Sequence, residues 1–393
     1  MSKYWTEDEL TTLVTSFSDI AASDISLREI ADILSGTLTD RSPESIRKKL
    51  MSLQTSGELE ELINQTSEMS DSKISSKEFV DYIDRRCVSL PSRPFPVPSE
   101  RPRNPVVVNI LMGDTQYGMS FTERDTYGLN KYDSKEFTNR LKVYMSQLND
   151  ALHSIAASRD IVSVSISFLG DMVEGFGIFR GQQNFLDKKI SDQVFDMGDI
   201  MAELVMWLAE RVPKVYAHCV SGNHGRMSKD HHPNDNFDNM AYKIMQRRVE
   251  NQENVNVYIY DKVGVYRIPE ASNFTWLISH GEEVPFNSGR PANSATKKAD
   301  NYKAITNVGV NYVCFGHLHK EASVSIPYGK VYINGSWIGG HPLVLSRAND
   351  ITSASQTILV VDPDDGVIQE HTLMLSRPKE LLPDDELILV PYE

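Results

Sequence analysis

Five short segments of the chain gather carboxylates, amides and histidines: "GDTQ" (113–116), "GDMVEG" (170–175), "SGNHGR" (221–226), "SHGEE" (279–283) and "GHLH" (316–319). Side chains two residues apart on an extended chain point the same way, so Asp114 can act with Gln116, and His317 with His319. Together these segments supply oxygen and nitrogen donors that suit two divalent metals of the Mn, Zn or Fe kind and are too soft for calcium. The sequence therefore predicts a dinuclear metal site.

The elements that must position these donors are strands, because each cluster ends an apolar run rich in strand-forming residues. The segments between the clusters have helical periodicity, and this alternation predicts an α/β domain whose last part, 322–374, adds an antiparallel sheet or sheet edge. In open α/β sheets the binding crevice lies outside the carboxyl ends of the strands. We therefore expect the clusters to converge, although more than two hundred residues separate Asp114 from His319.

The ordered motifs D-x-[H/Q], GDxxE, GNH, H and GHxH resemble those of the calcineurin-like metallophosphoesterase superfamily over roughly residues 105–345. The stretches "EGFGIFRGQQ", "SGNHGRMSK", "ISHGEEVPF" and "INGSWIGG" further resemble a branch of that superfamily that is common in phage genomes and is often labelled repair-exonuclease-like. The resemblance implies a sandwich of two mixed β-sheets flanked by helices. It also implies hydrolysis of phosphoric esters with a water that bridges two metals as the nucleophile.

The same resemblance assigns roles to individual residues. It implies that the metal ligands are Asp114 and His319 on the first metal, Asp171 as the bridge, and Asn223, His280 and His317 on the second metal. His224 would be the proton donor or transition-state stabiliser beside the phosphate, because an imidazole titrates near neutral pH.

Gln116 departs from the family pattern, which usually has a histidine at this position. An amide oxygen in place of an imidazole makes the first site harder, so the expected cofactor is two divalent metals with Mn preferred and Mg, Zn or Fe possible. The alternative is that Gln116 only orients the Asp114 carboxylate through a hydrogen bond.

Three further residues have a functional and a structural interpretation. The guanidinium of Arg226 could bind a phosphate oxygen, or it could pair with a loop acid such as Asp230. Trp337 could stack on a base or could pack in the core. Glu174 is expected to accept a hydrogen bond from a metal-ligand histidine.

Residues 1–55 predict a small all-α domain that resembles the Myb/SANT class of helix-turn-helix modules. Thr6 and Glu9 have the spacing of a capping box, and "SPESIRKKL" begins with a Ser-Pro pair that is typical of a helix start. Arg47, Lys48 and Lys49 would face DNA. The alternative is a protein-contact or oligomerisation bundle.

The remaining segments predict a Ser- and Pro-rich linker region at 56–104, a metallophosphoesterase domain at 105–375 and an acidic C-terminal tail at 376–393. Three cysteines without paired spacing, no signal peptide and no membrane span favour a cytoplasmic protein, in the host cytoplasm if it is phage-encoded. With a net charge of -14, any anionic substrate must be held locally by metals or a few cations.

The sequence thus favours a DNA phosphodiesterase, with DNA as substrate and with a possible protein partner on the N-terminal bundle or the C-terminal tail. Two alternatives remain open. One is a phosphatase or nucleotide phosphodiesterase, since a fold does not fix a substrate. The other is a non-catalytic DNA-binding protein whose metal site has degenerated at Gln116.

Overall fold

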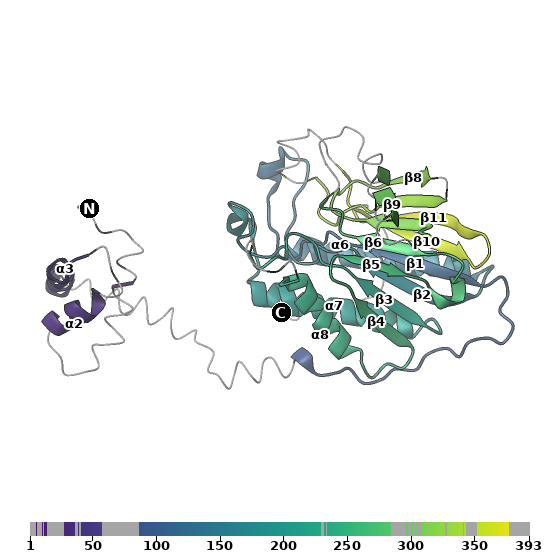
Figure 1. The fold of residues 1–393 in the computed structure, drawn as a ribbon, viewed down its shortest axis with the longest axis horizontal. Helices are drawn as coiled ribbons and strands as arrows, with labels where there is room; N and C mark the ends of the chain where they lie inside the picture. The colour runs from purple at the N-terminus through teal and green to yellow at the C-terminus, as the bar shows by residue number, and fades with distance from the viewer. Residues whose placement is uncertain are drawn as a thin grey trace. The chain divides into compact units, whose positions relative to one another are not determined.

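The chain divides into two compact units, Met1–Arg85 and Arg86–Glu393. The structure is a computed structural model that describes residues 27–35 and 41–56 of the first unit, residues 86–228, 234–283, 309–326, 328–340 and 352–376 of the second, and a few single residues elsewhere. Figure 1 labels the elements of both units. Residues 57–85 and the tail at 377–393 lie outside this description.

The described part of the first unit is helical, with α2 at Leu27–Leu34 and α3 at Pro43–Ser56. Ser42 accepts a hydrogen bond from the backbone N–H of Ser45 at 3.3 Å, so the Ser-Pro start predicted for this helix is confirmed. The two helices share a small apolar core made by Leu13, Ile30, Ala31, Leu34, Leu38, Ile46, Leu50 and Leu53.

The second unit contains two mixed sheets, as the sequence predicts. The first has the strand order β11-β10-β1-β2-β3-β4, with bounds β1 Val106–Met112, β2 Ile161–Phe168, β3 Val215–Cys219, β4 Val255–Ile259, β10 Ser355–Asp362 and β11 Gly366–Met374. The second has the order β5-β6-β7-β9-β8, with bounds β5 Val263–Tyr266, β6 Trp276–Ser279, β7 Tyr312–Phe315, β8 Ala322–Ile326 and β9 Gly329–Ile333.

The strands that precede the polar clusters run parallel in both sheets. Strands β1 to β4 pair in parallel, and so do β6 with β7 and β7 with β9, whereas β10, β11, β5 and β8 pair antiparallel to their neighbours. Apolar side chains fill the space between the sheets, with Val107, Leu111 and Leu359 of the first sheet in one cluster with Ile278 and Cys314 of the second. This shared core fixes the two sheets relative to each other.

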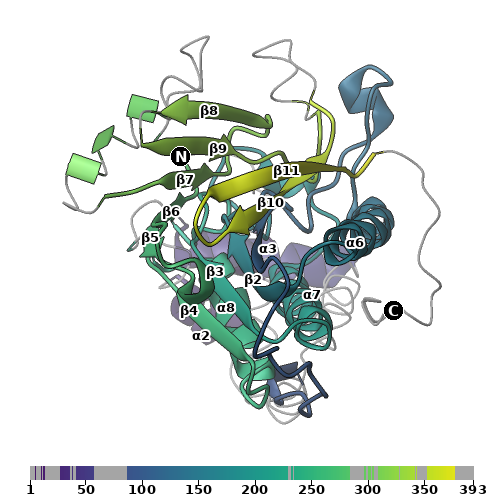
Figure 2. The ribbon, with the colours of Figure 1, turned by 90° about the vertical axis from the view of Figure 1, so that its right-hand side faces the viewer.

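Helices α6 (Ser134–Ala156), α7 (Ile190–Ala209) and α8 (Phe237–Arg248) pack against β11, β3 and β4 of the first sheet. Figure 2 shows α6 and α7 on the side of that sheet that faces away from the second sheet. Because this sheet is covered on both faces, all seven residues of β1 are buried. None of the helices in the described ranges is long and apolar enough to cross a membrane.

Residues 86–104, which the sequence assigns to a linker, belong to the second unit and pack against the rest of it. Arg86 is paired with Asp196 at 2.5 Å and with Asp199, both on α7. Arg93 is paired with Glu203 at 2.7 Å and with α7's neighbouring residue Glu210 at 3.1 Å. This Pro-rich segment is therefore held by charge pairs along a helix of the domain and does not act as a free spacer.

Candidate metal centre

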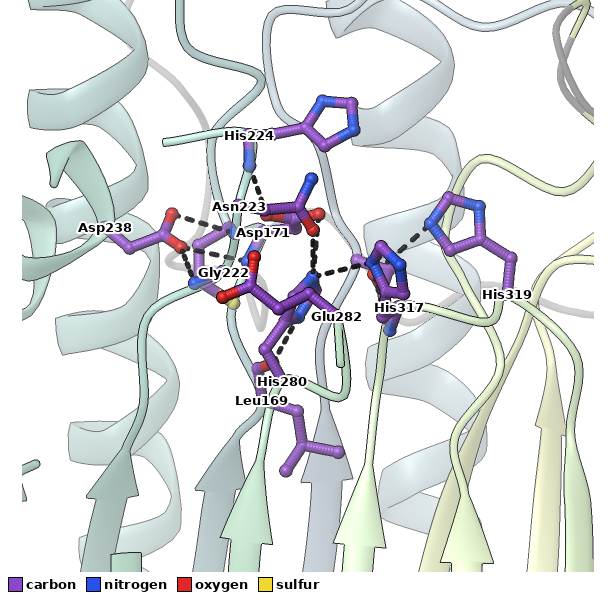
Figure 3. Close-up of polar contacts among 12 residues, drawn as sticks. Leu169, Asp171, Gly222, Asn223, His224, Asp238, His280, Glu282, His317 and His319 are labelled. Atoms are coloured by element: carbon purple, nitrogen blue, oxygen red, sulfur yellow. Dashed lines mark hydrogen bonds and ion pairs between the residues drawn. The ribbon is translucent and has the colours of Figure 1, made fainter. Parts of the chain in front are cut away.

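The predicted site residues converge where the parallel strands of the two sheets end (Figure 3). Asp114 and Gln116 follow β1, Asp171 follows β2, and Asn223 and His224 follow β3 in the first sheet. The second sheet contributes His280 after β6, and His317 with His319 after β7. Sheet packing thus brings together residues that are distant in the chain.

The tightest part of the site surrounds His280. Its Nε2 lies 3.0 Å from Oδ2 of Asp171, 2.9 Å from Oδ1 of Asn223 and 3.2 Å from Nδ1 of His317. Ligand atoms of Asp171, His280 and His317 all lie within 4.8 Å of one another. A buried carboxylate, an amide oxygen and two imidazoles in contact form a donor set that fits a divalent transition metal.

A second group of donors surrounds Asp114, whose carboxylate is fully buried. Nε2 of His319 lies 3.2 Å from its Oδ1, and the backbone N–H of His317 donates to the same carboxylate, at 2.9 Å to Oδ2. The backbone of one predicted ligand therefore orients the side chain of another. Asp114 and His319 therefore lie together, as expected for two ligands of one metal, and their role stays a prediction.

Gln116 is 1% exposed, and its Oε1 has no hydrogen-bond partner among the described residues. Its backbone N–H donates to the carbonyl of Asp171 at 2.9 Å, which fixes its place beside the bridging residue. Within the described part of the chain no hydrogen bond joins its side chain to Asp114. A buried acceptor without a partner is costly in a native fold, and a metal ion would satisfy it.

Replacing Gln116 by histidine is expected to tighten binding of the first metal by about 10-fold, most of all for Zn, because an imidazole nitrogen replaces an amide oxygen. Isothermal titration of Mn and Zn into metal-free protein measures this change. Gln246→His, at an exposed position of α8, serves as the control. Weaker binding of both metals by Gln116→His would reject ligation and leave Gln116 as an orienting residue.

The backbone at the predicted ligands is unusual, because five of them have left-handed φ values. These are Asp114 (54°), Gln116 (43°), Asp171 (50°), His317 (64°) and His319 (54°). Residues other than glycine rarely adopt this region, and where they do the strain commonly accompanies function. The strained turns redirect the chain as each strand ends and aim these side chains at one point.

Two motif glycines leave room for the carboxylates. A Cβ on Gly222 would lie 2.1 Å from Oδ1 of Asp171, and a Cβ on Gly316 would lie 2.6 Å from Oδ2 of Asp114. Any larger residue would collide with the metal-ligand side chains. The glycines of the GNH and GHxH motifs therefore serve close packing against the predicted ligands.

His224 is linked to both the metal cluster and a second carboxylate. Its backbone N–H donates to Oδ1 of Asp171 at 2.8 Å, and its Nδ1 lies 2.8 Å from Oε2 of Glu174. Burial lowers the pKa of His224, but the carboxylates of Glu174 and Asp171 outweigh burial and raise it to about 9. The two carboxylates therefore favour the charged form of the imidazole.

Burial also acts on the donors themselves. It lowers the pKa of His280, but the Asp171 carboxylate outweighs it and raises the pKa to about 10. Burial and the charge of His280 lower the pKa of His317 to about 3. The pKa values of the two imidazoles are therefore shifted in opposite directions, because the Asp171 carboxylate dominates at His280, whereas burial and the charge of His280 dominate at His317.

The structure corrects one sequence interpretation and bears on the two interpretations of two other residues. Glu174, expected to support a metal-ligand histidine, contacts His224 instead. The guanidinium of Arg226 is paired with Glu282, which also lies 3.3 Å from Lys262, so the ion pair with a loop acid is formed, with Glu282 as the partner. Trp337 is fully buried between the rings of Phe137 and Tyr144, so it packs in the core and cannot stack on a base.

Asp238, the second residue of α8, is a site residue that sequence reasoning missed. Its fully buried carboxylate accepts four backbone hydrogen bonds at 2.8 to 3.1 Å, from Asp171, Met172, Val173 and Gly222. Burial and the nearby Asp171 carboxylate raise the pKa of Asp238. One side chain therefore ties the GDMVE loop to the GNH loop. In the sequence it resembles an ordinary acid in the first turn of a helix.

No family model matches the sequence, and no curated protein sequence matches it. Among solved structures it is similar to Vps29 of Entamoeba histolytica complexed with Zn, at 15% identity over 68% of this chain and 99% of that chain, with a TM-score of 0.29. An archaeal phosphodiesterase is 12% identical over 68% and 99% of the two chains, with a TM-score of 0.30. A predicted phosphoesterase of Streptococcus pneumoniae is 12% identical over 44% and 90%, with a TM-score of 0.25. The residue roles therefore stay predictions from the sequence resemblance, and the geometry of the site shows only that these residues lie together.

Proposed function

We propose that the protein is a phosphoesterase that depends on two divalent metals. The observation that carries this proposal is the cluster of Asp171, His280 and His317, whose ligand atoms lie within 4.8 Å of one another at the carboxyl ends of strands from both sheets. The unpaired oxygen of Gln116 and the nearby pair of Asp114 and His319 supply further donors. Such a mixed donor set suits Mn, Zn or Fe, and the harder Gln116 oxygen favours Mn.

In this proposal Asp114, Gln116 and His319 would hold one metal, Asn223, His280 and His317 would hold the other, and Asp171 would be shared by the two. When bound, the metals supply Lewis-acid stabilisation of the phosphoryl oxygens and a nucleophile at neutral pH. His224 donates a proton to the leaving oxygen. Glu174 holds the His224 ring at Nδ1 and stabilises its charge, so the other ring nitrogen is the one that transfers the proton.

We further propose that the substrate is a DNA phosphodiester. The support is the sequence resemblance to repair-exonuclease-like proteins, together with a helical first unit whose α3 carries Arg47, Lys48 and Lys49. Arg47 donates to Glu44 at 3.0 and 3.1 Å, but pairs of exposed charges are weak, so Arg47 can exchange Glu44 for a phosphate.

One experiment tests the proposed function. The purified protein is incubated with Mn, Mg, Zn or a chelator and with single-stranded DNA, double-stranded DNA, an aryl phosphodiester or an aryl phosphomonoester. We expect Mn-dependent cleavage of DNA and of the aryl phosphodiester. Cleavage of the monoester alone would make the protein a phosphatase. A protein that binds DNA and cleaves nothing with any metal would be a binding protein with a degenerate site.

Replacing Arg47, Lys48 and Lys49 together by alanine is expected to weaken DNA binding. The slope of log K against log salt should flatten by about 0.9 for each DNA phosphate that the variant no longer neutralises. Cleavage of the aryl phosphodiester should not change, because the small substrate needs only the metal centre. If the variant binds DNA like the parent across a salt series, the first unit is a protein-contact bundle.

A further inference from the structure

The loop that follows the GDMVE motif exposes aromatic side chains next to the polar centre. Phe176 is 56% exposed and Phe179 is 39% exposed, whereas Trp276 and Trp337 are fully buried. Exposed phenylalanines lose the free energy that burial would provide. Exposed phenylalanines in a loop beside a candidate active site therefore indicate a binding surface.

Phe179 contacts the proposed proton donor. Its ring centroid lies 4.8 Å from that of His224, at an interplanar angle of 52°. This is a tilted aromatic contact, which leaves part of the Phe179 ring open to solvent. A leaving group that receives its proton from His224 must pass close to this ring.

The loop is held in place by a buried glutamine. Oε1 of Gln182 accepts from the backbone N–H groups of Ile178 at 2.9 Å and Phe179 at 3.3 Å. Its Nε2 donates to the carbonyl and to Oε1 of Glu174, at 2.7 and 3.0 Å. Since Oε2 of Glu174 contacts His224, these hydrogen bonds tie the Phe179 backbone to the proton donor. The aromatic surface is thus built into the site.

We propose that Phe179 forms a stacking surface for the nucleobase of the nucleoside that leaves from the phosphate. This proposal rests on the proposed function, because it needs a phosphodiester at the metal centre and proton donation by His224. Every base has a π-face, so a phenylalanine surface binds bases without sequence preference. It needs no positive charge, which suits a chain with a net charge of -14.

The test uses dinucleoside monophosphates that carry two bases, and matched compounds in which one nucleoside is abasic. The variant is Phe179→Leu, which keeps apolar contact with His224 and removes the π-face. KM for the two-base compound should rise about 5- to 100-fold with kcat nearly unchanged. The compound that lacks the leaving-side base should show no change between wild type and variant. Phe179→Tyr should restore the wild-type KM.

The matched control is Tyr258→Leu. Tyr258 is also a partly exposed aromatic, at 44%, and it also stacks on a histidine, His218, at 5.1 Å, but it lies on β4 outside the site. This variant should behave like wild type on both compounds. An equal loss by Phe179→Leu on both compounds would mean that Phe179 only supports His224, and no loss on either would mean that it binds no base. Both results would overturn the proposal.

A binding measurement separates this proposal from the proposed function. A dinucleotide that contains 2-aminopurine loses fluorescence when its base stacks, whether or not the phosphate is cleaved. Quenching by wild type that is lost in Phe179→Leu supports the stacking surface even if no phosphodiester is hydrolysed. Equal quenching by both proteins would overturn it even if hydrolysis is observed.

Discussion

Replacing His224 by alanine is expected to lower turnover by about 10²- to 10⁴-fold while the protein keeps its metals. This range is the usual contribution of a general acid. Metal should remain because the imidazole of His224 contacts Glu174, and only its backbone N–H contacts a predicted ligand, Asp171. Elemental analysis for bound metal and a rate measured with the aryl phosphodiester give the two readouts.

His153→Ala is the matched control, because His153 lies exposed on α6, where its Nδ1 is 2.9 Å from the backbone carbonyl of Asn149. It should change neither readout. If His224→Ala lost metal in proportion to activity, His224 would be a ligand and the division of roles would be wrong.

Replacing Asp171 by alanine is expected to remove both metals and to lower activity more than about 100-fold. Loss of a residue that only hydrogen-bonds to a metal ligand costs up to about 100-fold, and loss of a ligand itself should cost more. Oδ2 of Asp171 contacts His280, which follows a strand of the second sheet, and Oδ1 accepts a hydrogen bond from the backbone N–H of His224, which follows a strand of the first sheet. One carboxylate therefore contacts residues from both sheets. Asn223→Ala should chiefly weaken the second metal. Elemental analysis after dialysis measures both.

Asp171→Asn keeps the side-chain shape and separates the loss of charge from the loss of packing. It should also lose metal, because a neutral amide cannot replace a bridging carboxylate. Glu270→Gln is the control, since Glu270 accepts hydrogen bonds from Ser163 and Tyr216 outside the metal centre. Full occupancy of both metals in either Asp171 variant would show that the bridge is misplaced.

Much of the fold and of the candidate site can be predicted from the sequence, because strand ends and motif glycines have recognisable local sequence patterns. Apolar runs that end in polar clusters predicted an α/β domain, and the resemblance of the motifs implied two mixed sheets; the structure confirms both. The predicted ligands converge as the carboxyl ends of the strands require. Their roles remain predictions. The sequence drew attention to Gln116 because it lies two residues after Asp114, and the structure adds that its Oε1 has no hydrogen-bond partner among the described residues.

The sequence could not predict which side chains pair when distant segments of the chain pack together. Arg226 meets Glu282, 56 residues away, and Asp238 holds backbone N–H groups up to 67 residues away. A charged or polar side chain has many possible partners in the unfolded chain, and sequence spacing does not rank them. The attachment of residues 86–104 to α7 has the same origin, because it depends on arginines that reach acids on one face of a folded helix.

The sequence by itself therefore determined which candidate donor side chains lie at which strand ends, because these properties depend on residue type and on local periodicity. Only the tertiary structure decided which other side chains contact the site. Glu174 and Phe179 contact His224, and Asp238 accepts hydrogen bonds from the backbone of the GDMVE loop. The physical reason is that burial fixes a side chain's partner. Once a polar group leaves water, it must take the partner that packing places within reach.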